Sequence, residues 1–504
     1  MSEPITRRRI LTDYRIRVAK CEQCGKQYFP PKSFCDVEGR HSKISHIEYF
    51  NDKGTIVSAN IVRRPTNNFR YLDSLLTAVI AFDQGQIKIP GRITDYTPSN
   101  QEVDVTRFID REVVPRFRRM FCDGESGQIY YSSLAFSFTD DYYSYQNYVI
   151  ETPSNEELGK PGIVGYGVYI PKYRIKNTPD SGTGVEERTL PFADEDMVTF
   201  AVEAAKRALI HSASPSKLVT KCVVGSESNP YSVKPATSII TQALELGERF
   251  NDGFFTGGTS TQFACKAATD EFIDAVSLVT NPVFTDGGER TVMVIGSDNS
   301  QAAKNDPLDY SVGAGAAAFL FGARDVIATL DAFVTYSSDT SDFWRRDGQK
   351  YPKHGGRFTG EPSYFKHVLT ATRRLMEKTK LKTCDIDYVG FHSPNIKFPI
   401  TVAEKMRFNP EQYETGLIAR WIGNLYSGSC PTALAAILDL AKPDERILIT
   451  SYGSGAGSDA YLFTITEKIK DKRERSIPVI NQIQSEHREY VTYETYRKWK
   501  EIGS

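Results

Sequence analysis

Hydrophobic residues follow two different patterns along this chain of 504 residues. Over residues 49–138, short stretches alternate apolar and polar residues or are rich in β-branched residues, and Gly, Asn and Asp separate them. The clearest stretches are GTIVSANIVRR, LTAVIAFDQGQIKIPGRI and GQIYYSSLAFSF. Such stretches are typical of short strands joined by turns. We therefore predict a small β-barrel over residues 49–140.

From Pro161 onward, strand patterns alternate with helix patterns. DMVTFAVEAAKRALI places Ala, Val and Leu at helical spacing, whereas TVMVIGSD and ERILITSYGSG are apolar runs that end in polar or Gly-rich turns. This alternation predicts an α/β fold with helix-covered sheets over residues 161–470. The two halves of the stretch end in the similar strand patterns GAAAFLFGA and AYLFTITEK, which suggests an internal duplication.

Three further segments complete the predicted organisation. Residues 1–48 contain the cysteine cluster CEQCGKQYFPPKSFC, and we assign them to a zinc-ribbon-like segment with an N-terminal helix. Residues 141–160 are polar and rich in turn residues, which is typical of a linker. Residues 471–504 form a charged and then aromatic tail, which is either disordered or packed back on the protein as an arm.

Length and composition exclude several classes of protein. The chain is too long for one hydrophobic core, so we expect at least two domains. Hydrophobic residues make up 40% and charged residues 25%, which is ordinary for a soluble protein, and the net charge of −1 argues against a general nucleic-acid surface. The longest apolar stretch, near Ala314–Ala323, is about half of a membrane span. We expect neither a membrane nor a nucleic acid as a partner.

The eight cysteines are too sparse and scattered for a disulfide scaffold. The N-terminus, MSEPITRRRILTDYRIR, is charged and has no apolar core, so it is not a secretory signal. Both features favour reduced thiols and a cytoplasmic location.

Cys265 is the candidate nucleophile. It lies in QFACKAATDEFIDAVSLV, where small alanines surround the thiol and a helix pattern follows. A cysteine at or near the N-terminus of a helix experiences the helix dipole and free backbone N–H groups, which favour the thiolate. The alternative is a buried cysteine of the core, which is the commoner fate of a single cysteine.

Two titratable residues and two turns are candidates for the same site. Glu227 follows an apolar strand in VVGSESNP, and His392 follows another in DYVGFHSPN. A surface glutamate and a satisfied core histidine are the alternatives for these two residues. The turns GNLYSGSC and SYGSGAGS are rich in Gly and Ser, which allows backbone N–H groups to approach a ligand oxygen. Either turn by itself fits an ordinary tight turn equally well.

Taken together, these motifs resemble the 3-hydroxy-3-methylglutaryl-CoA synthase family of the thiolase superfamily. The resemblance runs from residue 162 to about residue 468, and the tail EYVTYETYRKW is similar to the end of archaeal-type members. The motifs that carry it, in chain order, are GSES, FACKAAT, SDFWRRDGQKYP, FHSPNIK, GNLYSGS and SYGSG. The resemblance implies a duplicated, layered αβαβα fold and, by analogy with the superfamily, a homodimer.

The resemblance also implies a reaction and a role for each residue. Cys265 would take an acetyl group from acetyl-CoA as a thioester, and Glu227 would remove a proton from the acetyl methyl group. His392 would then polarise the ketone of acetoacetyl-CoA. Hydrolysis would release 3-hydroxy-3-methylglutaryl-CoA. CoA thioesters are thus the implied substrates.

A second group of residues would bind the substrates. Asn424 would orient acetoacetyl-CoA, and Lys397 would reach toward the CoA phosphates. The backbone near Cys265 and Ser454 would form the oxyanion hole. Gly453 and Ser429, in the same two Gly/Ser-rich turns, complete the implied substrate-binding set.

The N-terminal cysteines suggest a metal site. Cys21-x-x-Cys24 with Cys35 downstream is half of a zinc ribbon plus one further ligand, and the position of a second Cys-x-x-Cys is occupied by Glu38, with His41 three residues on. Two alternatives remain. The three thiolates could bind zinc together with Glu38 or His41, or the ribbon could have lost its metal and kept its fold.

The N-terminal module as a whole resembles the zinc-ribbon and OB-fold proteins that accompany acyl-CoA condensing enzymes. In archaeal mevalonate synthesis, such a module is similar in role to a scaffold between an acetoacetyl-CoA thiolase and the synthase. A thiolase is therefore an implied partner, and an inert appendage is the alternative. An OB-fold also suggests nucleic-acid binding, which the neutral net charge disfavours.

Three functions follow from these observations. The first is the synthase. The second is a related cysteine-dependent condensing enzyme that uses another acyl-CoA, which the fused N-terminal module keeps open. The third is a scaffold that binds acyl-CoA for a thiolase, which the joint presence of Cys265, Glu227 and His392 opposes.

Overall fold

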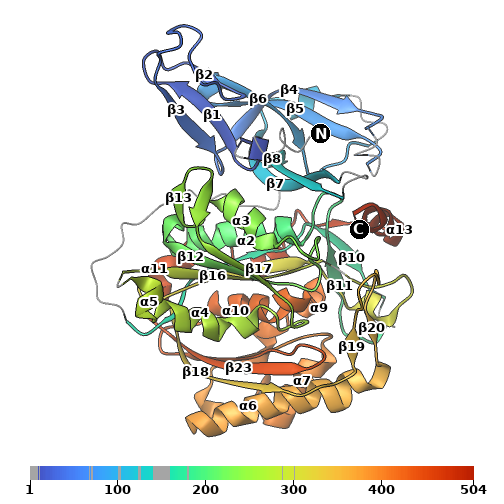
Figure 1. Cartoon of the computed structure of the whole chain (residues 1–504). Helices are drawn as coiled ribbons and strands as arrows, with labels where there is room; N and C mark the ends of the chain where they lie inside the picture. Colours follow the sequence, from blue (N-terminus) through green and yellow to red (C-terminus); the bar gives the residue numbers. More distant parts are fainter. Residues whose placement is uncertain are drawn as a thin grey trace. The chain divides into compact units, whose positions relative to one another are not determined.

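Two units make up the computed structural model of this chain, which describes residues 9–10, 12–66, 69, 72–99, 104–122, 127–139, 159–178, 181–286, 288–299 and 301–503 (Figure 1). Unit 1 comprises Met1–Tyr148, Phe192–Glu195 and Glu494–Ser504, and unit 2 comprises Val149–Pro191 and Asp196–Tyr493. The predicted linker, residues 141–160, lies outside the described residues except for its last two positions. Most of the predicted N-terminal helix lies outside them as well.

Unit 1 contains a small sheet and a closed barrel. The sheet has the order β2-β1-β3, with β1 (Ile16–Cys21) antiparallel to both β2 (Gln27–Tyr28) and β3 (Ile44–Tyr49). The barrel closes in the order β4-β5-β6-β8-β7. Its strands are β4 (Gly54–Val62), β5 (Leu75–Phe82), β6 (Ile87–Ile93), β7 (Glu112–Cys122) and β8 (Ile129–Phe138). The predicted small barrel is therefore confirmed, and its assignment as an OB-fold stays a prediction.

Strand β7 was not among the predicted strands, because its sequence, EVVPRFRRMFC, is rich in arginine. Arg118 is fully buried, and its guanidinium pairs with Asp95 at 3.1 Å and with Glu195 at 3.2 Å. Arg92 of β6 pairs with Asp194, which also accepts a hydrogen bond from Thr94. Buried charges persist only when they are paired, so these carboxylates allow an arginine-rich strand to be buried and hold Phe192–Glu195 in unit 1.

Unit 2 is built on a sheet of nine strands in the described part of the chain. Across the sheet the strands are β15 (Gly257–Thr261), β12 (Val219–Gly225), β16 (Thr291–Asp298), β17 (Gly315–Gly322), β9 (Gly162–Tyr169), β18 (Ala328–Ser337), β23 (Gly457–Ile465), β22 (Arg446–Thr450) and β21 (Tyr388–Phe391). β15 and β18 were not predicted as strands, because Gly-rich and exposed positions weaken the apolar pattern of both.

The strand order confirms the internal duplication. In the first half, β12 and β16 are parallel, β17 is antiparallel to β16, and β9 is antiparallel to β17. In the second half, β21 and β22 are parallel, β23 is antiparallel to β22, and β18 is antiparallel to β23. The strands GAAAFLFGA and AYLFTITEK, whose similarity suggested the duplication, are the corresponding strands β17 and β23.

Helices cover and separate the two halves of the sheet, which gives the layered α/β arrangement expected for a thiolase-like fold (Figure 1). α2 (Met197–Ser212) packs on β9 and β17, while α4 (Phe272–Val279) and α10 (Ser429–Leu438) lie between the halves. α6 (Phe365–Thr379) packs on β18 and β23. The other helices are α3 (Ala236–Leu244), α5 (Pro282–Thr285), α7 (Lys397–Met406), α8 (Pro410–Tyr413), α9 (Ala419–Ile422), α11 (Ile469–Lys472), α12 (Val479–Ile483) and α13 (Tyr493–Gly503).

Minor sheets complete unit 2. β10 (Tyr173–Lys176) pairs with β11 (Glu187–Leu190) and, in parallel, with β24 (Glu489–Tyr490) of the tail. The tail is therefore packed back on the protein along this stretch. Two hairpins are formed by β13 (Glu248–Phe250) with β14 (Gly253–Phe255), and by β19 (Phe343–Trp344) with β20 (Lys353–His354). Within the described residues, no helix has both the length and the apolar character that a membrane crossing requires.

Candidate active site

Cys265 lies in a tight turn between β15 and α4. Ala264, the residue before it, has a φ of +46°, a left-handed conformation that is costly for a residue with a Cβ. A 3₁₀ turn over Thr269–Glu271 follows, and α4 begins only at Phe272. The thiol is therefore placed by a strained turn that precedes the helix, and not by the first residues of the helix itself.

Glycines let two other segments approach this turn. A Cβ added to Gly225, the last residue of β12, would overlap the backbone of Ala267 and Ala268. A Cβ added to Gly453 would overlap the carbonyl oxygen of Phe263. The end of β12 and the loop after β22 thus pack directly on the backbone on either side of Cys265, and any side chain at either glycine would push them away.

The first predicted pair of site residues is in contact. The Cys265 Sγ donates a hydrogen bond to Glu227 Oε1 at 3.1 Å. Asn424 also hydrogen-bonds the thiol, and its Oδ1 accepts the backbone N–H of Tyr426 at 2.9 Å, which fixes the amide. Three residues from separate segments therefore meet at one sulfur atom.

Burial changes the protonation of this pair. Burial, followed by the charge of Glu227, raises the pKa of the Cys265 thiol well above its ordinary value, so the prediction of a thiolate favoured by a helix dipole was wrong. The pKa of Glu227 is raised to about 8, first by desolvation and then by the neighbouring carboxylate of Asp298. At neutral pH, most of the protein therefore holds both groups uncharged.

Asp298 is a functional candidate that the sequence analysis missed. It is fully buried at the end of β16, and its Oδ1 accepts hydrogen bonds from the backbone N–H of Glu227 and from the hydroxyls of Ser226 and Ser228. Its Oδ2 accepts the backbone N–H of Ser427 at 2.8 Å. Four donors from two loops thus stabilise one carboxylate. Asp298 ends an apolar strand in the same way as Glu227 follows one, and that signal could have identified it.

His392 is buried after β21. Tyr364 donates a hydrogen bond to its backbone carbonyl at 2.6 Å, and its own N–H bonds to Thr450. Burial lowers the pKa of His392 to about 3, so the imidazole is neutral, and its buried Nδ1 has no hydrogen-bond partner in the described part of the chain. A neutral imidazole with an unsatisfied nitrogen suits a group that hydrogen-bonds a ligand.

Asp342 holds the loop that joins His392 to the cysteine turn. The ring of Tyr452 lies 6.4 Å from that of His392, and its hydroxyl donates to Asp342 at 2.6 Å. Asp342 also accepts the backbone N–H of Gly455 at 2.8 Å, while Ser454 hydrogen-bonds Tyr452. Because Gly453 lies between these residues and packs on the cysteine turn, the loop connects the two predicted catalytic residues. Asp342 lies in the DFWR motif, but its role needed the tertiary contacts.

The predicted substrate-binding residues Ser429 and Lys397 make no direct hydrogen bond to Cys265 in the described structure. Ser429 is buried as the first residue of α10 and lies two residues after Ser427. The Ser427 hydroxyl accepts a hydrogen bond from the backbone N–H of Ala268, in the turn that contains Cys265, at 3.1 Å. Lys397 is exposed at the first residue of α7. The described contacts do not join Lys397 to the group around Cys265.

The surroundings of the thiol are apolar on one side and basic on another. Buried Ala302, Val312 and Tyr426 cluster with Cys265, and Leu308 and Phe343 pack against them. On the other side, the Arg345 guanidinium bonds to the backbone carbonyl of Glu227 at 2.7 Å, and Gln301 bonds to the same oxygen at 3.1 Å. The site therefore combines apolar surroundings of the thiol with a fixed backbone at Glu227.

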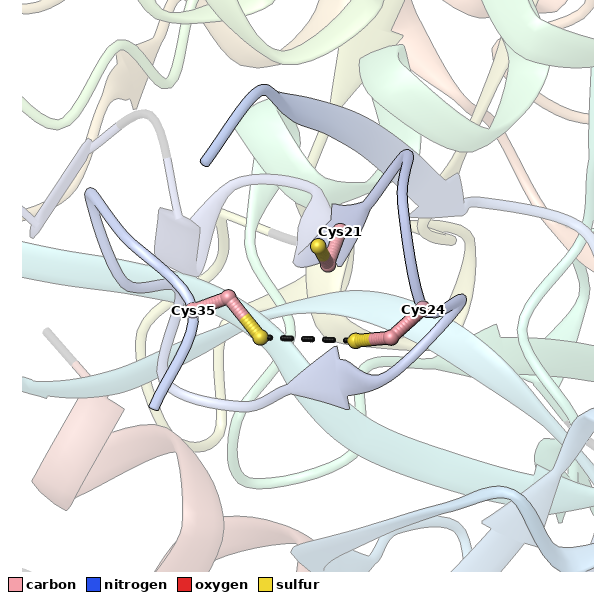
Figure 2. A group of neighbouring side chains, drawn as sticks. All are labelled: Cys21, Cys24 and Cys35. Carbon is pink, nitrogen blue, oxygen red and sulfur yellow. Dashed lines mark hydrogen bonds between the residues drawn. The ribbon is translucent and has the colours of Figure 1, made fainter. Parts of the chain in front are cut away.

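A separate cluster in unit 1 has the chemistry of a metal site. The sulfurs of Cys21, Cys24 and Cys35 lie within 4.8 Å of one another, and the Cys24 and Cys35 sulfurs are 3.4 Å apart (Figure 2). Three converging thiols are the donor set that zinc prefers, so the residues fit this ion. Glu38 and His41, the two predicted candidates for a fourth ligand, do not belong to this cluster in the described structure.

Known families match both parts of the chain. The family described as 3-oxoacyl-[acyl-carrier-protein (ACP)] synthase III C terminal matches residues 376–465. The family described as ChsH2, rubredoxin-like zinc ribbon domain, matches residues 8–39.

Curated relatives match the part that contains Cys265. The chain is 43% identical over 351 residues to the hydroxymethylglutaryl-CoA synthase of Methanopyrus kandleri, and the match covers 67% of this chain and 97% of the relative. It is 43% identical over 354 residues to the synthase of Methanocaldococcus jannaschii, which covers 67% and 98%.

Solved structures share the fold. MvaS in complex with 3-hydroxy-3-methylglutaryl coenzyme A superimposes with a TM-score of 0.60 at 22% identity, covering 69% of this chain and 93% of that one. An HMG-CoA synthase complexed with CoA gives 0.59 at 21% identity, with coverages of 67% and 90%. The Curacin biosynthetic pathway HMG synthase in complex with acetyl donor-ACP gives 0.60 at 20% identity, with coverages of 68% and 88%.

The contact between Cys265 and Glu227 predicts how the thiol titrates. In Glu227→Gln, the negative charge that raises the thiol pKa is absent, so the alkylation of Cys265 by iodoacetamide should reach its half-maximal rate at a lower pH than in the unmodified protein. Mass spectrometry of the modified peptide measures this rate, and the exposed Cys384 serves as an internal control. An unchanged or higher midpoint would show that the carboxylate does not act on the thiol.

Proposed function

Because the chain belongs to the hydroxymethylglutaryl-CoA synthase family, we propose that residues 161–470 condense acetyl-CoA with acetoacetyl-CoA to give 3-hydroxy-3-methylglutaryl-CoA. The observation that carries the proposal is the hydrogen bond of 3.1 Å between the Cys265 thiol and Glu227. It joins a nucleophile to a carboxylate in apolar surroundings, which is the arrangement that acyl capture followed by proton abstraction requires.

The first step forms an acetyl-enzyme. The Cys265 sulfur attacks the carbonyl carbon of acetyl-CoA, and the tetrahedral intermediate expels CoA, which leaves with the proton from the thiol. Because burial raises the pKa of this thiol, the proton must leave the Cys265 sulfur as the attack proceeds, and the departing CoA sulfur receives it. Backbone N–H groups near Cys265 and Ser454 are the proposed oxyanion donors, and Gly453 lets the two segments approach closely.

The second step forms the carbon–carbon bond. Glu227 removes a proton from the methyl group of the acetyl thioester, and the resulting enolate attacks the ketone carbon of acetoacetyl-CoA. A neutral His392 hydrogen-bonds the ketone oxygen, on which negative charge develops. This oxygen takes up a proton from solvent to become the hydroxyl group, and Glu227 releases to solvent the proton that it removed. Water finally cleaves the thioester to Cys265, which frees the thiol and the product.

Other residues are proposed to bind the substrates. The amide of Asn424 is fixed beside the sulfur, where it can orient acetoacetyl-CoA, and Ser429 supports the same turn from the start of α10. Lys397 is proposed to bind the CoA phosphates, which its exposure and its place at the start of α7 permit. The small apolar group around the thiol, which includes Phe343 and Val312, favours a short acyl group.

The N-terminal module and the cellular setting complete the proposal. A zinc ion held by Cys21, Cys24 and Cys35 would stabilise the fold of the ribbon, which is a structural role. We also propose that unit 1, which matches the family described as ChsH2, rubredoxin-like zinc ribbon domain, binds an acetoacetyl-CoA thiolase. The eight free cysteines support a cytoplasmic location.

The reaction itself is tested by incubating the purified protein with acetyl-CoA and acetoacetyl-CoA and following acylated protein and product by mass spectrometry. The unmodified protein should form both an acetylated Cys265 and 3-hydroxy-3-methylglutaryl-CoA. Cys265→Ser should form neither, because the hydroxyl lacks the nucleophilicity of the thiol. Glu227→Gln should retain acetylation but lose product by about 100-fold or more, within the usual contribution of a general base.

Two outcomes would redirect this proposal. Acetylation of Cys265 by the unmodified protein without product would indicate a different acceptor thioester. Neither acetylation nor product would favour a scaffold that binds acyl-CoA for a thiolase. Glu289→Gln, a carboxylate paired with Arg324 elsewhere in unit 2, is the control and should keep both signals.

The raised pKa of Glu227 predicts the pH dependence of condensation. A general base acts in its deprotonated form, so the rate should rise as pH increases through about 8 and level off above it. Arg345→Gln removes a cation that lowers this pKa and should shift the rise to higher pH, whereas Asp298→Asn removes an anion that raises it and should shift the rise to lower pH. Initial rates measured with saturating substrates test this, and shifts in the same direction would contradict the assignment of Glu227.

A homodimer is proposed through the free edge of the sheet. β15 is the edge strand, and the hairpin that precedes it exposes Phe250 and Phe255, whose side chains are 63% and 64% accessible. Edge strands with apolar neighbours are natural pairing surfaces, and a two-fold contact would pair β15 with its copy. Light scattering should give a mass of twice 56.6 kDa for the unmodified protein and a smaller mass for Phe250→Glu/Phe255→Glu. A monomeric unmodified protein would exclude this interface.

A further inference from the structure

We infer that Glu38 supplies the fourth ligand of the zinc site in unit 1, so that the ion is held by three cysteine sulfurs and one carboxylate oxygen. The inference concerns only unit 1 and does not depend on the condensation chemistry. The observation behind the inference is that the ribbon contains two similar turns. The sequence shows this repeat only in part, because one of the four ligand positions in the two turns holds no cysteine.

The ribbon contains two turns of the same construction. The first begins at Cys21 and ends at Gly25, whose backbone N–H bonds to the Cys21 carbonyl at 2.9 Å. The second begins at Cys35 and ends at Gly39, whose N–H bonds to the Cys35 carbonyl at 2.9 Å. Both glycines have a left-handed φ, of +76° and +80°. Each turn therefore starts with a cysteine, closes with the same hydrogen bond and exits through a glycine.

The equivalence of the turns assigns the ligand positions. In the first turn, the second ligand, Cys24, immediately precedes the glycine; in the second turn, that place is taken by Glu38. In both turns backbone N–H groups face a cysteine sulfur: that of Lys26 faces Cys24 in the first turn, and those of Val37 and Glu38 face Cys35 in the second. The second turn is thus built to present a ligand at residue 38.

Further contacts hold the second turn in this shape. The Ser42 hydroxyl accepts the backbone N–H of Cys35 at 2.7 Å and donates to the Gly39 carbonyl at 2.8 Å. The Tyr28 hydroxyl accepts the backbone N–H of Asp36 at 3.0 Å and lies 3.1 Å from the Cys35 sulfur. These bonds hold the second turn in the same form as the first, although the second turn contains a single cysteine.

The side chain of Glu38 is available for the ion. It is exposed, and its carboxylate takes part in no hydrogen bond or ion pair recorded among the described residues. It lies outside the cluster of the three sulfurs, so metal binding requires rotation of its side chain, which no contact opposes. Zinc accepts carboxylate oxygen as well as thiolate sulfur and prefers four ligands in structural sites.

His41 is the less suitable candidate. It lies two residues beyond the glycine that ends the turn, so its equivalent in the first turn is Gln27. The Gln27 side chain bonds to Asp83 and Gln86, away from the sulfurs. A carboxylate also preserves the net charge that four thiolates would give the site, whereas a neutral imidazole would not.

Cobalt binding to the full-length, reduced, metal-free protein tests the inference, because cobalt reports its ligands through visible and charge-transfer absorption. Glu38→Cys should complete a four-thiolate site, raise the thiolate-to-cobalt absorption by about one third and bind zinc more tightly, since sulfur is the softer ligand. Glu38→Ala should weaken zinc binding by about tenfold or more and change the visible bands. His41→Ala and Glu22→Ala, an exposed carboxylate in the first turn, should match the unmodified protein.

Three results would overturn the inference. Changed bands in His41→Ala with unchanged bands in Glu38→Ala would make His41 the ligand. Unchanged bands in both variants would leave the fourth position to solvent. Less than about 0.2 zinc per chain in freshly purified, reduced protein, measured by elemental analysis, would mean that the ribbon has lost its metal. Circular dichroism of each variant separates these results from a failure to fold, and Glu38→Cys keeps the test valid if Glu38→Ala does not fold.

Discussion

The geometry of the site depends on the hydrogen bonds that the buried carboxylate of Asp298 accepts. A charge in a protein interior is stable only if it is well paired or hydrogen-bonded, and four donors satisfy this one. The donors come from the loop after β12 and from the turn before α10, so a single group fixes two segments that are far apart in sequence. Glu227 belongs to the first segment, and its distance from Cys265 therefore follows from the position of Asp298.

The same arrangement places the nucleophilic thiol of Cys265 beside a carboxylate, which raises the pKa of the thiol and does not activate it. A nucleophilic thiol is usually activated by a positive environment, but Cys265 is buried against a carboxylate, and both influences raise its pKa. The thiol is thus protonated at neutral pH and is a poor target for alkylation. The neighbouring carboxylate, whose pKa is also raised, can accept a proton near neutral pH. One pair of groups can therefore serve both the capture of the acyl group and the later removal of a proton from it.

Unit 1 depends on buried ion pairs in its barrel and on the cysteine cluster in its ribbon. It is small and rich in strands, and its barrel includes an arginine-rich strand whose fully buried Arg118 requires Asp95 and Glu195 as partners. Glu195 lies between two stretches of unit 2 in the sequence, so the ion pairs hold within unit 1 a segment that is remote from the barrel strands along the chain. The ribbon beside the barrel has few apolar residues of its own, and a metal ion would supply the stability that its core does not.

The sequence by itself determined the alternation of strands and helices, the barrel pattern, the duplication seen in β17 and β23, and the candidates Cys265, Glu227 and His392. These features are local: a periodic apolar pattern or a polar residue at the end of a strand is visible without neighbours. Only the tertiary structure decided that the thiol is protonated, that Asp298 organises the site, and that β7 can bury its arginines. Each of these depends on partners distant in sequence, because desolvation and pairing are set by what surrounds a group in space.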